Sequence, residues 1–186
     1  ARSVLNFMDK IIPDESFPEL SKPAWFVNLF LFTKELKENY AIKGMERTIY
    51  DFYKRFFATI EESRNATTSV DPEIVRFYDA NKSGTTSRKN IKTRFEIMIG
   101  HFLDENPKIQ LKDDTRGFSE TQRIAIYRRD KGICQNPACS AVLRWDEFHA
   151  DHKTPHSLGG KTIVLNGQVL CPSCNSAKQA NPKIGY

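Results

Sequence analysis

The chain has 186 residues, 39% hydrophobic and 27% charged, so it is long enough to bury a core and is not wholly disordered. Its formal net charge of +5 permits a polyanionic partner without requiring one. The longest apolar run, residues 24–33, is too short to span a bilayer, and no signal peptide is recognisable. Because the first residue is Ala rather than Met, we expect the chain to be a fragment of a longer protein.

Residues 1–105 are predicted to be helical. Apolar residues recur at steps of three and four in three separate stretches, which is the pattern of one buried stripe per helix. Twelve of the 13 Phe residues lie at or before Phe118, so we expect four or five helices packed on one aromatic core. The stripes are Trp25, Leu29, Phe32 and Leu36, then Ile49, Tyr53, Phe56 and Ile60, then Ile91, Phe95, Met98 and Phe102.

Residues 106–118 are polar and are predicted to be a connector. Ser119 and Gln122 have the spacing of a capping box, so a new helix is expected to start there and to stop near Gly132. Residues 117–186 contain nine Lys or Arg and five Asp or Glu, a net charge of +4, which points to this segment as the one that meets a polyanion. A basic cluster also lies earlier in the chain, and it is either a phosphate contact or a solvated face. It consists of Arg88, Lys89, Lys92 and Arg94.

All four cysteines lie in two close pairs, Cys134 with Cys139 and Cys171 with Cys174. Without a sign of secretion, this placement favours a metal site over disulfides. Zinc takes four thiolates in a tetrahedron, and four thiolates leave no open position, so the predicted zinc is structural rather than catalytic. The alternative is four reduced thiols without a ligand.

Residues 148–178 are predicted to form a strand, a loop rich in Gly and Pro, a second strand and a helix. Asp151 and the amide oxygen of Asn175 are suitable ligands for a hard divalent cation. A neutral imidazole nearby, such as that of His152, is able to take a proton from water near neutral pH. A cation, a base and a positive field together suit the hydrolysis of a phosphodiester.

This stretch, FHADHKTPHSLGGKTIVLNGQVLCPSCNSAK, resembles the HNH nuclease motif, also called the ββα-metal fold. The resemblance covers about residues 118–181 and places His152, Asn166 and Asn175 at the three signature positions, with Asn where many members have His. It implies that His152 is the general base and that Asn166 holds the loop which orients it. It also implies that Asp151 and Asn175 bind a catalytic Mg²⁺ or Mn²⁺ and that the four cysteines bind a structural Zn²⁺.

Candidate DNA contacts surround this motif. For the two histidines the alternatives are surface residues or auxiliary metal ligands, and for the lysine at the end of the motif the alternative is a solvated helix cation. The candidates are Lys178, Arg128, Arg129, Lys131, His149 and His156.

Together these features predict an α+β protein with a helical accessory domain (1–105), a connector (106–118) and a zinc-stabilised HNH module (119–186). The expected activity is metal-dependent hydrolysis of DNA, in restriction or defence in the cytoplasm of a bacterial host. The alternatives are a non-catalytic zinc module that binds nucleic acid and a nuclease that acts on RNA. We expect DNA as the partner, no membrane, and either a further N-terminal domain or a homo-oligomer.

Overall fold

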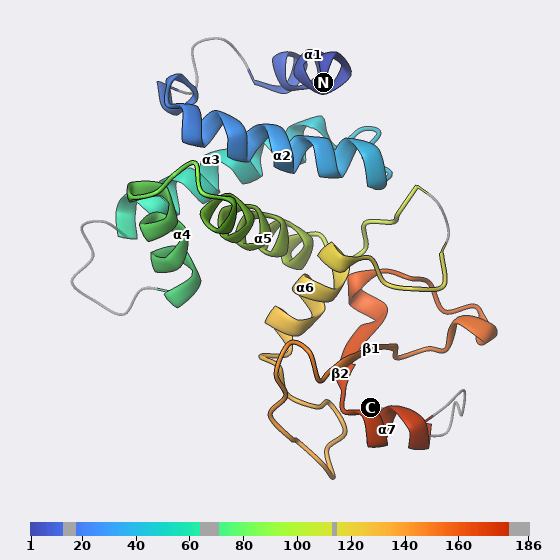
Figure 1. The fold of residues 1–186 in the computed structure, drawn as a ribbon. Coiled ribbons are helices and arrows are strands. Elements are labelled where there is room, and N and C mark those ends of the chain that lie inside the picture. Colours follow the sequence, from blue (N-terminus) through green and yellow to red (C-terminus); the bar gives the residue numbers. More distant parts are fainter. Residues whose placement is uncertain (13–17, 64–70, 113–114, 179–186) are drawn as a thin grey trace. The chain divides into compact units, whose positions relative to one another are not determined.

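The structure is a computed structural model, and it describes residues 1–12, 18–63, 71–112 and 115–178. Parts of the predicted connector (113–114) and of the predicted module (179–186) lie outside these ranges. The described residues form seven α-helices and one two-stranded sheet (Figure 1). None of these helices is both long enough and apolar enough to cross a membrane.

The chain divides into two units, residues 1–99 and residues 100–186, and the boundary falls within helix α5 (Arg88–Glu105). The first unit confirms the predicted helical N-terminal region. Its remaining helices, with a 3₁₀ turn at Pro18–Ser21, are α1 (Arg2–Ile11), α2 (Pro23–Asn39), α3 (Glu46–Ser63) and α4 (Pro72–Lys82).

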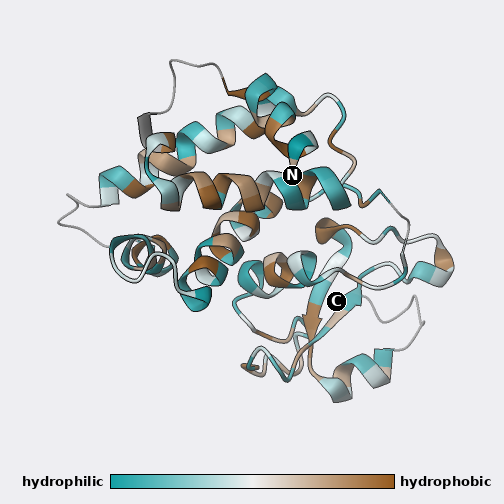
Figure 2. Ribbon diagram, turned by 45° about the horizontal axis from the view of Figure 1, so that its top comes forward, coloured by the Kyte–Doolittle hydropathy of each residue, from teal (hydrophilic) through white to brown (hydrophobic). Residues whose placement is uncertain are grey.

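The core of the first unit is aromatic. Trp25 meets Phe57 edge to face with ring centroids 4.7 Å apart, and Phe32 stacks on Phe52 at 5.5 Å. Figure 2 shows apolar and polar residues alternating along the helices, as expected when one stripe of each helix is buried. Each such ring buries about 150–250 Å², so these contacts are a main source of stability for the unit.

Arg94 differs from the solvated or phosphate-binding cation that the sequence suggests. Its side chain is 0% exposed, and its guanidinium donates to Asn28 Oδ1 at 2.8 Å, to the carbonyl of Ala80 at 2.5 Å and to that of Thr85 at 2.8 Å. Burial lowers the pKa of this guanidinium. Arg94 therefore joins three segments of the helical unit.

The second unit contains α6 (Glu120–Arg129), the strands β1 (His149–His152) and β2 (Gly167–Leu170), and α7 (Pro172–Lys178). The strands are antiparallel, with Asp151 opposite Gln168 and His152 opposite Gly167. Short 3₁₀ turns at 156–158 and 164–166 lie in the loop between them. This is the predicted order of strand, loop, strand and helix, so the α+β fold class is confirmed.

Helix α6 supports the hairpin. Its N-terminus has the predicted capping box, in which the Ser119 and Gln122 side chains each bond the other residue's backbone N–H. At its other end Arg129 donates to the carbonyls of Val164 at 2.7 Å and Gly167 at 2.6 Å. A Cβ on Gly167 would lie 2.2 Å from Cδ1 of Ile126, so a larger residue there would force the Ile126 side chain to move.

Candidate functional site

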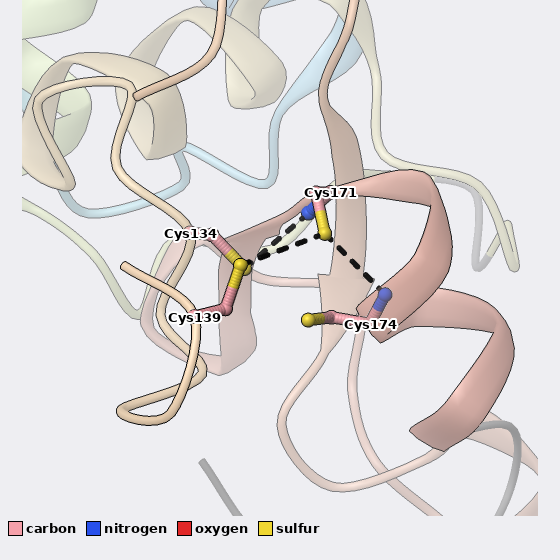
Figure 3. Close-up of side chains that lie close together, drawn as sticks. All are labelled: Cys134, Cys139, Cys171 and Cys174. Carbon is pink, nitrogen blue, oxygen red and sulfur yellow. Dashed lines mark hydrogen bonds between the residues drawn. The ribbon is translucent and has the colours of Figure 1, made fainter. Parts of the chain in front are cut away.

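The four cysteines converge at the end of the hairpin beside α7. Their ligand atoms all lie within 4.8 Å of one another, and Figure 3 shows the sulfurs turned toward one another. A tetrahedral zinc with bonds of about 2.3 Å separates its sulfurs by about 3.8 Å. The Sγ atoms of Cys139 and Cys171 are 3.9 Å apart, so the cluster has the size that zinc requires.

Local hydrogen bonds hold three of these sulfurs in place. The backbone N–H of Cys171 donates to Cys134 Sγ at 3.4 Å, and the Asn136 amide donates to Cys174 Sγ at 3.1 Å. The Ser173 hydroxyl and the backbone N–H of Cys174 lower the pKa of Cys171 to about 6, whereas burial raises the pKa of Cys134. Four neighbouring thiolates need a cation to offset their charge, so this donor set fits a structural zinc.

His152 ends β1 and is half-buried. Its ring stacks on Phe118 with centroids 4.3 Å apart, and its Nε2 lies 3.0 Å from Thr162 Oγ1. Burial lowers the pKa of His152, and the neighbouring carboxylate of Asp151 opposes this effect. The imidazole is therefore neutral at neutral pH, which is the form that accepts a proton.

Asn166 closes the loop that follows His152. Its Oδ1 accepts from the Thr154 N–H at 2.9 Å, and its Nδ2 donates to the carbonyls of Thr154 at 3.0 Å and Lys161 at 2.9 Å. A Cβ on Gly160 would lie 1.8 Å from the Thr154 carbonyl oxygen, which explains one glycine of the Gly-Gly pair. The loop is thus tied down two residues after His152.

Asp151 is held by two donors on one oxygen. Its Oδ2 accepts from Gln168 Nε2 at 2.9 Å and from Lys178 Nζ at 2.6 Å. Lys178 also donates to the carbonyl of His152 at 2.6 Å, and its side chain is 1% exposed. The alternative of a solvated helix cation is therefore wrong for Lys178. No described residue bonds Oδ1 of Asp151, so that oxygen is open to another ligand.

Asn175 lies one turn before Lys178 on α7. Its Nδ2 is 2.9 Å from Nδ1 of His149, which is on the same face of β1 as Asp151. Within the described ranges its Oδ1 has no hydrogen-bond partner. One open carboxylate oxygen and one open amide oxygen are donors that Mg²⁺ and Mn²⁺ accept, so the donor types of these residues suit the implied cation.

The remaining candidate DNA contacts divide into two groups. Arg128 donates to Asp104 and to the ring of His101, and Arg129 holds the loop before β2. Lys131 and His149 are exposed, and the ring of His156 lies 5.9 Å from that of His152. Lys131, His149 and His156 therefore form the group whose side chains a ligand can reach.

Phe118, Thr162 and Gln168 also contact the candidate catalytic residues, and none was expected from the sequence. For Gln168 a signal exists, because a hairpin in the observed register puts it opposite Asp151. Phe118 lies far before His152 in the chain and Thr162 lies ten residues after it in the loop, and no spacing rule links either of them to His152.

Comparison with known proteins identifies the same segment. Residues 134–181 match the family model described as HNH endonuclease, so the chain contains an HNH domain that includes all four cysteines. No curated protein and no solved structure matches the chain. An HNH domain indicates nuclease activity in general, and hence a nucleic acid as substrate.

Proposed function

We propose that this chain is a metal-dependent endonuclease that hydrolyses phosphodiester bonds in DNA, with the HNH domain at 134–181 as its catalytic part. The observation that carries the proposal is the state of His152. Its imidazole is half-buried, one ring nitrogen lies 3.0 Å from Thr162 Oγ1, and no described residue bonds the other. Burial lowers the pKa of the ring, which favours the neutral form. This is the arrangement that a general base requires.

In the proposed reaction His152 takes a proton from the attacking water. Asp151 Oδ1 and Asn175 Oδ1 would hold Mg²⁺ or Mn²⁺, which when bound stabilises negative charge on the phosphate and on the leaving oxygen. Gln168 and Lys178 fix the other oxygen of Asp151, so the carboxylate keeps one orientation. Asn166 keeps the loop after His152 in place.

DNA contacts are proposed for Lys131, His149 and His156, which are open to a ligand. Arg128, Arg129 and Lys178 instead bond protein oxygens, and we propose that they act through the fold. The net charge of +4 between 117 and 186 attracts a phosphate backbone. Restriction or defence in a bacterial cytoplasm is the proposed setting, by analogy with helical segments that precede HNH modules elsewhere.

A non-catalytic zinc module that binds nucleic acid is the second candidate. One observation favours it, because Lys178 already neutralises the carboxylate of Asp151 at 2.6 Å and so reduces the attraction for a cation. An RNA-directed nuclease would use the same site on a different substrate.

A cleavage assay on supercoiled plasmid distinguishes these functions. We expect the purified chain to nick or linearise it with Mg²⁺ or Mn²⁺ and to leave it intact in EDTA. His152→Ala should lower the rate by roughly 10²-fold to 10⁴-fold, the usual contribution of a general base. His101→Ala, which removes a histidine of α5, is the matched control and should cleave like the wild type. Binding without cleavage would support the zinc module, and cleavage of RNA alone would support the RNA-directed nuclease.

A further inference from the structure

We propose that Thr162 is a positioning residue for His152 and that it holds the imidazole as the tautomer with its proton on Nε2. The inference rests on the proposed function, in which His152 is the general base. Thr162 lies in the loop between the two strands and is 5% exposed. Its Oγ1 is 3.0 Å from Nε2 of His152, within hydrogen-bond distance.

The direction of this hydrogen bond follows from the other partner of the hydroxyl. A hydroxyl has one hydrogen to donate and two lone pairs to accept with. Thr162 Oγ1 donates to the backbone carbonyl of Arg116 at 3.5 Å. Because a carbonyl only accepts, the hydroxyl hydrogen is directed in this proposal to Arg116 and Oγ1 accepts from His152, which puts the ring proton on Nε2 and the lone pair on Nδ1. No described residue bonds Nδ1, so it is the nitrogen left to take a proton from water.

Thr162 is itself held by the start of α6. The Gln122 side chain is 0% exposed and donates from Nε2 to the Thr162 carbonyl at 2.9 Å. Its Oε1 accepts from the backbone N–H of Ser119, which completes the capping box. Phe118, just before the cap, stacks on the His152 ring at 4.3 Å. One short segment thus fixes both the plane of the imidazole and the direction of its N–H.

This bond gains strength during the reaction. When His152 has accepted a proton it is an imidazolium, and the bond from Nε2–H to Oγ1 becomes charge-assisted. If the Thr162 hydroxyl already accepts from Nε2–H, it keeps this hydrogen bond when Nδ1 is protonated. If it instead donated to Nε2, the bond would be lost, because both nitrogens of an imidazolium carry a proton. Thr162→Val keeps the shape of the side chain and removes the acceptor. We expect kcat to fall by about 10-fold to 100-fold with KM for the plasmid unchanged.

The first test measures the tautomer of His152 directly. Long-range ¹H–¹⁵N correlation spectra of the full chain at pH 8 report which ring nitrogen is protonated, and the spectrum of His152→Ala assigns the signal. We expect Nε2 to be protonated in the wild type and in Thr162→Ser. In Thr162→Val we expect a mixture of tautomers. A wild-type ring protonated on Nδ1 would overturn the proposal.

Cleavage of plasmid by the same variants provides the second test. Thr33→Val, the same change at a buried threonine of α2 whose hydroxyl bonds Leu29 and Tyr53, is the matched control and should cleave like the wild type. Thr162→Ser should restore most of the rate. A Thr162→Val variant with wild-type kcat and a wild-type tautomer would overturn the proposal. An inactive wild type would overturn the proposed function instead, while the spectra would still decide the role of Thr162.

Discussion

Replacing Lys178 with Met tests how α7 is fixed to the hairpin. Met keeps an apolar stem of similar length but removes the charge and the bonds to Asp151, His152 and Lys153. The carboxylate of Asp151, whose side chain is 17% exposed, would keep the bond from Gln168 and no other from a described residue. Removing one partner of a buried ion pair costs about 3–5 kcal/mol. Because Asp151 retains some exposure, we expect the lower end, about 3 kcal/mol.

Amide hydrogen exchange of β1 and α7 in the zinc-bound protein measures this cost as a free energy of opening. Asp151→Asn combined with Lys178→Met should cost about 1–2 kcal/mol less than the sum of the single changes, because the double variant leaves no unpaired charge. The control is Lys131→Met, an exposed lysine of the same unit, which should stay within about 0.5 kcal/mol of the wild type. Strict additivity, or a near-neutral Lys178→Met, would refute the proposed ion pair.

Two further outcomes concern the metals. Elemental analysis of protein purified without added metal should show one zinc per chain, and a folded, zinc-free wild type would contradict this. Cys171→Ser should lose the zinc and unfold the second unit, while circular dichroism still reports helix from residues 1–99. Brief EDTA should stop cleavage before it strips the zinc, and excess Mg²⁺ should restore it. Asn175→Ala should regain part of its rate in a metal titration and Asp151→Ala less, and an Asn175→Ala curve identical to the wild type would remove that residue from the cation site.

The sequence predicts the fold where a local pattern determines it. Apolar spacing of three and four marks the helices of the first unit, because a helix buries one stripe of its surface. The capping box at Ser119 marks the start of α6, because it satisfies backbone donors within a single turn. Two cysteine pairs indicate a common metal site for a similar reason, since each pair supplies two ligands from one short segment.

The sequence does not predict which cations are buried. Lys and Arg are usually exposed, and their burial requires acceptors that converge from distant parts of the chain. Arg94 finds two backbone carbonyls and Asn28, and Lys178 finds Asp151 with two further carbonyls. Backbone carbonyls are present at every residue, so no residue type marks the ones that will accept. Thr162 is missed for a related reason, because its partners come from three separate segments.

Three side chains, those of Lys178, Asn166 and Thr162, make hydrogen bonds around His152, and they bond different atoms. Lys178 bonds the backbone carbonyl of His152, and Asn166 bonds the backbone of Thr154. Both fix where the chain runs, and neither restricts rotation of the imidazole about its own side-chain bonds. Among the described residues, Thr162 is the one that hydrogen-bonds the ring, on which Phe118 stacks. Loss of a backbone tether should therefore lower the stability of the hairpin together with the cleavage rate, because both depend on the position of the strand. Loss of the Thr162 hydroxyl should lower the rate while amide exchange in β1 stays unchanged, since the strand keeps its own bonds when the ring loses this hydrogen bond.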